Sequence, residues 1–329
     1  MKNTRREFIK AGAIGAAVAA TGLPAVGAAG EMQSKRKAHK PLDILVLGGT
    51  GFIGPHMVRE ALRRGHSVTL FNRGRTNNAL FPDLETIKGD RDGGLDGLEG
   101  RQWDAVIDNS GYVPRHVQDS ARMLAPNIGR YLYISTVAVY ADIPSATDED
   151  SSLATIDDES IEDVTWETYG PLKALCEKRA AAEIDADNLT ILRPTYICGP
   201  GDHTDRFSYW PIRTRKGGEM LWAGTPDDVL QIVDVRDLAS FTIDCLDRDI
   251  SGTFNMVNKP RSYTMGRLLE DCQAITATAV DPVWIDENFL ASHDLNGGAQ
   301  LPIWQGSGRG FGVSVDRALE AGFQIRPER

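Results

Sequence analysis

The fold is decided by the stretch Leu42-Asp43-Ile44-Leu45-Val46-Leu47-Gly48-Gly49-Thr50-Gly51-Phe52-Ile53-Gly54. Residues 42–47 form a nearly continuous apolar run, which is typical of a parallel β-strand that is buried on both faces. The glycine-rich segment leads into residues 52–64, which are predicted to form a helix that ends at Gly65. A buried strand, a glycine-rich turn and a helix in this order predict a dinucleotide-binding site.

The glycines of this turn have the spacing G-x-x-G-x-x-G. Glycine lets the chain turn tightly and lets the backbone approach a pyrophosphate group closely. The helix that follows offers unpaired N–H groups and a partial positive charge at its N-terminus. We therefore expect the following residues of the loop to bind the cofactor: Gly48, Thr50, Gly51, Phe52, Ile53 and Gly54.

Strands and helices alternate through the first two thirds of the chain. Further strands are expected at 67–71, 85–88, 105–107, 131–134 and 189–192, with helices notably at 115–124 and 166–184. This rhythm predicts an α/β fold, with a Rossmann-type doubly wound parallel sheet in residues 41–195. Residues 196–329 are expected to form mainly a smaller C-terminal substrate lobe, of which 232–258 return to the sheet.

Two other segments are predicted to be less regular than the alternating strands and helices. Residues 260–329 are expected to be irregular, apart from helices near 265–275 and 314–321. The acidic stretch 142–163 lies between the fifth strand and the helix at 166–184, and is predicted to be a mobile surface loop.

The N-terminal residues 1–30 differ in composition from the rest of the chain. Thr4-Arg5-Arg6-Glu7-Phe8-Ile9-Lys10 is followed by a short apolar run rich in glycine and alanine. The paired arginines, the phenylalanine and the closing lysine resemble a twin-arginine signal peptide, and the run is too weak for a stable membrane span. The resemblance implies that the twin-arginine machinery exports the folded protein to the periplasm or the medium, with residues 31–40 as a linker.

Composition argues against two kinds of partner. The formal net charge is −10, which is a poor fit to a nucleic-acid backbone, so no nucleic-acid partner is expected. The six histidines form no ligand cluster and the four cysteines contain no C-x-x-C pair, so no metal site is expected. The cysteines are predicted to be buried free thiols.

The end of the second strand bears on the choice of cofactor. An NAD site usually places Asp or Glu there for the ribose 2′-hydroxyl, whereas this chain has Asn72-Arg73-Gly74-Arg75. An arginine can bind a 2′-phosphate through bidentate hydrogen bonds. Asn72 and Arg73 are therefore expected cofactor ligands, and the cofactor is expected to be NAD(P), with NADP slightly favoured over NAD.

A tyrosine and a lysine carry the expected chemistry. Tyr169 and Lys173 are four residues apart, so they share one face of the predicted helix. A cation beside a phenol favours the phenolate and lowers its pKa, so Tyr169 can exchange a hydroxyl proton while a hydride moves to or from nicotinamide. A hydroxyl at the end of the fifth strand can bind the reacting oxygen, and Ser135 and Thr136 both qualify.

Together these motifs resemble the extended short-chain dehydrogenase/reductase superfamily, and within it a divergent branch of the NAD-dependent epimerase/dehydratase family. The resemblance covers residues 42–202 through GGTGFIG, STVAVY, YGPLK and LRPTYICGPGD. It implies that Thr136, in preference to Ser135, is the catalytic hydroxyl and that Tyr169 is the acid/base. It also implies that Lys173 binds the nicotinamide ribose and tunes Tyr169.

The same resemblance assigns further cofactor contacts. Asp90 and Arg91 lie where the family contacts adenine, and Pro194 to Ile197 are expected to line the nicotinamide pocket. Relatives that act on nucleotide sugars usually carry an arginine for the diphosphate at the position of Leu230, so a non-nucleotide sugar is favoured as the small-molecule substrate.

Export also bears on the reaction. Free NAD(P) is scarce outside the cytoplasm, whereas an epimerase or dehydratase returns its hydride within one cycle and works with one retained cofactor. We therefore expect a sugar epimerase or dehydratase that acts by transient hydride transfer. An NADP(H)-dependent reductase of a small carbonyl compound stays open, as does a non-catalytic dinucleotide- or RNA-binding protein resembling plant chloroplast stem-loop binding proteins. A homodimer is compatible with each of these functions.

Overall fold

The computed structural model describes residues 40–143, 147–293, 295, 301–304, 306 and 312–326. The expected signal peptide at residues 1–30 and residues 31–39 of the expected linker lie outside the described residues. Within the described ranges, no helix has both the length and the apolar character needed to span a membrane.

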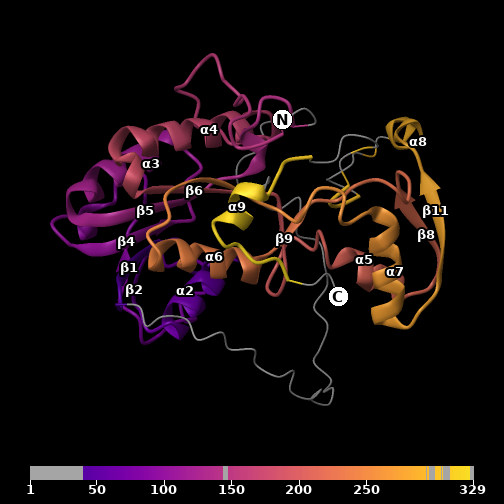
Figure 1. Cartoon of the computed structure of the whole chain (residues 1–329), viewed down its shortest axis with the longest axis horizontal. Helices are drawn as coiled ribbons and strands as arrows, with labels where there is room; N and C mark the ends of the chain where they lie inside the picture. The colour runs from indigo at the N-terminus through magenta and orange to yellow at the C-terminus, as the bar shows by residue number, and fades with distance from the viewer. Residues whose placement is uncertain are drawn as a thin grey trace.

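A parallel sheet of seven strands forms the centre of the protein, in the order β10-β6-β5-β4-β1-β2-β3 (Figure 1). Strand order reverses between β1 and β4, which makes the sheet doubly wound and confirms the predicted Rossmann-type α/β fold. A crevice for a ligand is expected at this switch point, at the carboxyl ends of the strands. The strands are β1 (Asp43–Leu47), β2 (Ser67–Asn72), β3 (Thr86–Lys88), β4 (Trp103–Asp108), β5 (Ile128–Ile134), β6 (Leu189–Pro194) and β10 (Gly252–Met256).

Helices on both faces of the sheet explain why β1 is apolar along its length. Ile44 and Val46 belong to the hydrophobic core under α2 (Gly54–Arg63) and α6 (Val235–Asp247). Leu45 and Leu47 belong to the opposite core, under α3 (Pro114–Leu124) and α4 (Trp166–Glu183). Because successive side chains point to opposite faces, a strand that is covered on both faces needs apolar residues at every position.

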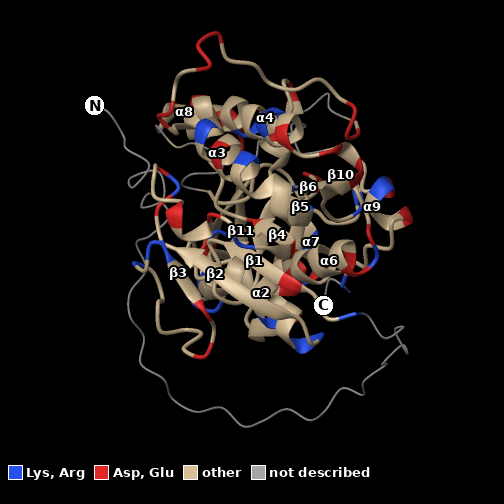
Figure 2. Ribbon diagram, turned by 90° about the vertical axis from the view of Figure 1, so that its left-hand side faces the viewer, with Lys and Arg blue, Asp and Glu red and all other residues tan. Residues whose placement is uncertain are grey.

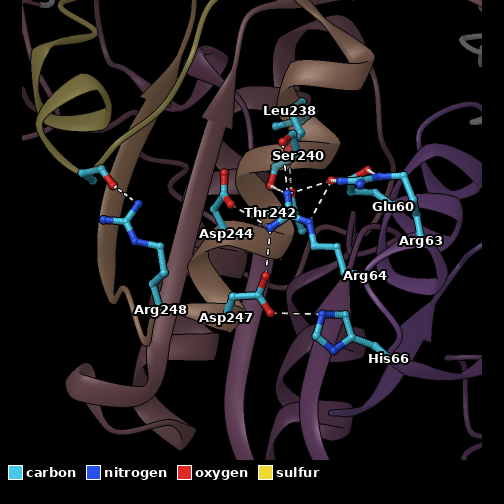
Figure 3. A network of polar contacts seen from close by, with 11 residues as sticks. Glu60, Arg63, Arg64, His66, Leu238, Ser240, Thr242, Asp244, Asp247 and Arg248 are labelled. Atoms are coloured by element: carbon cyan, nitrogen blue, oxygen red, sulfur yellow. Dashed lines mark hydrogen bonds and ion pairs between the residues drawn. The ribbon is translucent and has the colours of Figure 1, made fainter. Parts of the chain in front are cut away.

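A network of charged groups joins α2 to α6 (Figure 3). The guanidinium group of Arg64, after α2, lies 2.7 Å from Asp244 and 2.8 Å from Asp247 of α6, and also pairs with Glu60. His66 Nε2 lies 3.0 Å from Asp247, and both side chains are fully buried. Since the opposite end of α2 carries the glycine-rich loop, this network fixes the helix that positions the loop.

The C-terminal lobe is more regular than predicted. β8 (Gly218–Ala223) and β11 (Val280–Ile285) pair in parallel, and α5 (Tyr209–Thr214), α7 (Met265–Thr276) and α8 (Glu287–Ser292) lie beside them (Figure 1). The expectation of an irregular chain after residue 260 was wrong for β11 and α8. Each of the two strands pairs only with a distant segment, so local sequence patterns do not reveal them. Trp210 and Trp222 stack in the core of the lobe, with ring centroids 4.4 Å apart.

Two short strands connect the sheet to this lobe. β7 (Tyr196–Cys198) pairs with β9 (Ile232–Asp234), whereas β10 joins the central sheet beside β6. The return to the central sheet predicted for 232–258 therefore applies to β10, while β9 forms a separate pair. α9 (Asp316–Glu320) lies near the C-terminus and packs against β10.

The acidic stretch between β5 and α4 runs over the surface, and Figure 2 shows its acidic residues in red on the long loop beside α4. Its described parts are bound to the domain at several points. The carboxylate of Glu149 is buried and accepts a hydrogen bond of 2.7 Å from the Asn255 N–H group, and Glu162 lies 2.7 Å from Arg115.

Candidate cofactor crevice and active site

Three glycines of the loop meet three different spatial demands. Gly48 has φ +90°, and a Cβ atom there would lie 2.7 Å from Cβ of Ser110. A Cβ atom on Gly54 would lie 2.6 Å from the carbonyl carbon of Gly49, so only glycine lets α2 begin this close to the loop. Gly51 has open space around it, with no atom within 4 Å of a built Cβ. A pyrophosphate group can approach the backbone at Gly51.

The start of α2 offers its N–H groups to a ligand. Ile53 at the N-cap position provides no side-chain hydrogen bond to the first turn. Side chains hold carbonyls of the loop instead, since Asn109 donates to the Gly48 carbonyl at 3.0 Å and Asn77 to the Thr50 carbonyl at 3.1 Å. A cavity of about 500 Å³ opens at this end of α2 and is lined in part by Gly51, Phe52, Asn77 and His203.

The end of β2 presents an unpaired arginine. The Oδ1 atom of Asn72 accepts a hydrogen bond of 2.8 Å from the Gly74 N–H group, which forms a tight turn. This turn leaves Arg73 exposed, and its guanidinium group has no side-chain or backbone partner among the described residues. Arg75 is exposed in the same loop. The geometry suits Arg73 to an incoming anion at the cofactor crevice.

The side chain of Arg91 has a structural role. Its side chain is buried and forms an ion pair with Asp108, which lies fully buried at the end of β4, and it donates a 3.0 Å hydrogen bond to the His116 carbonyl. Burial alone would raise the pKa of Asp108, but the charge of Arg91 lowers it below the usual value. This ion pair occupies the side chain of Arg91, so the expected contact with adenine at this position stays a prediction for its backbone. Asp90 is half-buried, and its carboxylate accepts a 3.3 Å hydrogen bond from the Asp92 N–H group.

Tyr169 and Thr136 meet at the carboxyl end of β5. Thr136 follows the strand and caps a short 3₁₀ turn, accepting a 3.2 Å hydrogen bond from the Ala138 N–H group. Tyr169 lies in the first turn of α4, and its hydroxyl group is close enough to that of Thr136 for Thr136 to act on the pKa of the phenol. A Cβ atom on Gly170 would lie 2.2 Å from the Ala138 carbonyl oxygen, so the glycine after the tyrosine allows this close approach.

Lys173 is buried one turn further along α4. Its Nζ atom donates to the Gly111 carbonyl at 2.8 Å and to the Ile134 carbonyl at 2.7 Å, and lies 4.2 Å from the centroid of the Tyr133 ring. Burial lowers the pKa of Lys173 to about 8. An ammonium group has three donors, so one N–H remains for a ribose hydroxyl.

The pKa of Tyr169 is raised above its usual value, so the expectation of a lowered pKa is wrong for this geometry. Burial is the largest cause and the nearby Tyr112 adds to it, while the hydrogen bond from Thr136 and the charge of Arg206 lower the pKa in part. Lys173 donates to two backbone carbonyls, and desolvation of the phenol outweighs the effect of the nearby cations.

The Ser135 hydroxyl is hydrogen-bonded to a buried ion pair that the sequence did not reveal. Its hydroxyl donates to Glu177, which lies one turn after Lys173 on α4. Arg193 of β6 lies 2.6 Å from the same carboxylate and donates to the Tyr140 hydroxyl at 3.2 Å. These contacts tie α4 to β5 and β6 behind Thr136. The one sequence signal for this ion pair was that Glu177 lies four residues after Lys173, on the same face of the helix.

The segment after β6 contains the residues that are expected to line the nicotinamide pocket. Pro194 is buried at the end of β6, and Ile197 is half-buried in β7. Arg206, which the sequence did not single out, lies with its guanidinium carbon 5.3 Å from the centroid of the Tyr196 ring. The structure thus brings Thr136, Tyr169 and Lys173 together.

Comparison with known proteins agrees with this geometry. The sequence model of the NAD dependent epimerase/dehydratase family matches residues 44–257. The chain is 28% identical over 245 residues to the chloroplast stem-loop binding protein of 41 kDa b of Arabidopsis thaliana, covering 66% of this chain and 61% of the relative. It is 31% identical over 177 residues to a 2-alkyl-3-oxoalkanoate reductase of Stenotrophomonas maltophilia, covering 49% and 52%. The chain therefore spans between half and two thirds of the length of these relatives.

Solved structures share the fold. The Bordetella bronchiseptica enzyme WbmG in complex with NAD and UDP superposes with a TM-score of 0.64 at 16% identity, over 88% of this chain and 92% of that enzyme. At this identity the likeness shows the fold alone. The match of the family model covers more than half of the chain, and the chain belongs to the NAD dependent epimerase/dehydratase family.

Proposed function

We propose that the protein binds NAD(P) and acts as a sugar epimerase or dehydratase by transient hydride transfer with a retained cofactor. The observation that carries this proposal is that the hydroxyl groups of Thr136 and Tyr169 lie beside each other, one helical turn from the buried Lys173. A hydroxyl pair of this kind can hold one oxygen of a substrate and exchange its proton.

The chain contains the groups that a dinucleotide needs. The open backbone at Gly51 and the uncapped start of α2 fit the pyrophosphate, and the third N–H of Lys173 fits a ribose hydroxyl. The unpaired Arg73 fits a 2′-phosphate, which is why NADP is slightly favoured over NAD. When bound, NAD(P) supplies the acceptor and donor of hydride.

The residues of the chain move the proton. The raised pKa of Tyr169 keeps its proton at neutral pH, so the phenol is ready to donate to a carbonyl oxygen. In the reverse direction it accepts a hydroxyl proton, and the charges of Lys173 and Arg206 favour the phenolate that this direction requires. Thr136 holds the same oxygen in both directions, so oxidation and its reversal take place in one geometry.

A buried leucine supports a non-nucleotide sugar. Leu230 occupies the position at which nucleotide-sugar relatives usually place a cation, and it is 2% exposed within the core of the C-terminal lobe. An apolar side chain there offers no partner to a diphosphate. RNA binding is less favoured, because the formal net charge of −10 opposes a phosphate backbone.

The proposal includes export. The pattern Thr4 to Lys10 supports a twin-arginine signal in residues 1–30, and the proposed location is the periplasm or the medium. A protein that is exported folded can carry its cofactor with it. A reaction that returns its hydride in each cycle needs no further supply of NAD(P). The expected homodimer stays a prediction.

The nucleotide content of the purified protein tests this function. Protein from the native compartment is denatured after gel filtration, and the released nucleotide is identified by chromatography. We expect close to one NAD(P) per chain, and conversion of a sugar without added nucleotide. An empty protein that consumes added NADPH with a carbonyl compound would contradict the proposal and support the reductase.

A further inference from the structure

Arg206 is held in place on two sides. It lies in the segment between β7 and α5, where the Thr204 hydroxyl donates to Asp202 and accepts a 2.9 Å hydrogen bond from Nε of Arg206. The guanidinium carbon lies 5.3 Å from the centroid of the Tyr196 ring. A ring on one side and a hydroxyl on the other fix the plane of the guanidinium group.

The outer edge of this guanidinium group is unoccupied by other residues. Neither Nη atom has a hydrogen-bond partner in the described chain, and no carboxylate of that part lies within 4.0 Å of Arg206. The buried arginines near the site differ, since Arg91 pairs with Asp108 and Arg193 pairs with Glu177. A half-buried cation without a counter-ion is unfavourable until an anion binds beside it.

Arg206 follows β7, the strand of Tyr196, and lies against the ring of that residue. Its charge acts on Tyr169, as well as on Tyr196 and Cys198 of β7. Lys173, the other cation that belongs to the active site, is bound to two backbone carbonyls. Arg206 therefore acts by its charge on Tyr169 and keeps both Nη groups without a hydrogen-bond partner in the described part of the chain.

We propose that Arg206 determines substrate specificity by binding a carboxylate, so that the substrate is an acidic sugar of the uronic or aldonic acid class. This inference rests on the proposed function and names its substrate class. The two Nη groups form a planar fork that matches a carboxylate through two parallel hydrogen bonds. The Asp202 carboxylate, which shares Thr204 with Arg206, opposes further negative charge, so a carboxylate monoanion fits better than a phosphate dianion.

A neighbouring group fits the remainder of such a sugar. The Oδ2 atom of Asp202 is buried and has no hydrogen-bond partner among the described residues, while its other oxygen holds Thr204. A carboxylate oxygen in this state accepts a hydrogen bond from a hydroxyl group. A small molecule that carries a carboxylate and a hydroxyl group can therefore bind Arg206 and Asp202 together.

Calorimetry on the NAD(P)-loaded protein tests the proposal. The probes are D-glucuronate, D-galacturonate and D-gluconate, each compared with its neutral parent sugar, D-glucose or D-galactose, and with D-glucose 6-phosphate. We expect at least one acid to bind at least about tenfold more tightly than its parent, as a charge-assisted pair allows. Arg206→Gln is expected to weaken acid binding about ten- to a hundredfold while the affinities for neutral sugar and for NAD(P) stay unchanged.

Two further variants complete the experiment. Arg215→Gln removes the same charge from an exposed position nearby, so it is expected to leave all affinities unchanged. Arg206→Lys keeps the charge but lacks the planar fork, so it should restore acid binding only in part. This variant also serves if Arg206→Gln fails to fold, as judged by circular dichroism.

Three results would overturn the inference. One is that no acid binds better than its neutral parent, and another is that the phosphate sugar alone does. The third is a loss of NAD(P) affinity in Arg206→Gln that matches the loss of acid affinity, because Arg206 would then be a cofactor ligand. A neutral sugar that is converted by protein with retained NAD(P) would contradict this inference alone. Failure of the wild type to bind any nucleotide would contradict the proposed function itself.

Discussion

The hydroxyl groups of Thr136 and Tyr169 lie beside each other, although one residue follows a β-strand and the other lies in the first turn of a helix. The contact depends on the glycine between the tyrosine and the rest of the helix, because a side chain at Gly170 would collide with the Ala138 carbonyl. The pairing of the two hydroxyls is thus a consequence of backbone packing, and it can be disturbed without touching either hydroxyl.

Gly170→Ala is expected to lower both stability and activity. The new Cβ atom would lie 2.2 Å from a backbone oxygen, so α4 must move away from the turn at 137–139. Overpacking of this kind typically lowers the free energy of unfolding by about 1–3 kcal/mol. Urea unfolding measures the loss. An unchanged unfolding midpoint together with full turnover would show that the close approach has no role.

Gly51→Ala is the matched comparison, because the new Cβ atom would meet no other atom. Its backbone is not in the left-handed region and no atom lies within 4 Å of the new Cβ, so the unfolding midpoint is expected to stay the same. NAD(P) affinity is expected to fall, because the methyl group occupies space that the pyrophosphate needs. Calorimetry with each nucleotide measures the effect. Undiminished affinity would place the pyrophosphate elsewhere.

Arg73→Ala tests the choice of cofactor. If Arg73 binds a 2′-phosphate, the variant should lose about ten- to a hundredfold in affinity for NADP and little for NAD. Arg75→Ala is the control, since it removes the same charge from the same exposed loop. Titration of both variants with both nucleotides decides the matter, and equal losses for NADP and NAD would rule out this role.

The depressed pKa of Lys173 predicts a pH-dependent stability. The unfolded chain binds this proton up to pH near 10.5, whereas the folded chain releases it at about 8, so the folded state is penalised below pH 8 and the penalty disappears as pH rises through 8–10.5. Relative to Lys173→Met, the wild type should therefore gain up to about 3 kcal/mol over this range. Unfolding at a series of pH values measures the difference.

Lys178→Met is the control for this series. Lys178 lies on the same helix, but its side chain is 66% exposed, so removing it should produce no such trend between pH 8 and 10.5. A flat difference between the wild type and Lys173→Met over the same range would mean that the buried lysine keeps an ordinary pKa.

Local sequence patterns were sufficient to predict the central sheet and the glycine-rich loop. The run from Leu42 to Leu47 shows burial on both faces, and the spacing from Gly48 to Gly54 shows a turn into a helix, because both depend on neighbouring residues. Tyr169 and Lys173 could be paired for the same reason, since helical geometry fixes their spacing.

Contacts between distant segments were beyond the reach of such patterns. Arg91 stands in a motif that fits adenine, but a buried carboxylate on another strand engages its side chain. The residue types alone did not separate Ser135 from Thr136, whereas the structure binds the Ser135 hydroxyl to Glu177. The lack of a partner for Arg206 likewise depends on what the rest of the chain places around it, and no spacing in the sequence encodes that.

The most direct test of the proposed chemistry is the turnover of Tyr169→Phe on a sugar that the wild type converts with its retained NAD(P). The substitution keeps the ring and removes only the hydroxyl that lies beside Thr136, so turnover should fall about 10²- to 10⁴-fold while the nucleotide content per chain stays the same. Turnover equal to that of the wild type would contradict the account, because Tyr169 would then be a packing residue in a protein that binds a dinucleotide for another purpose.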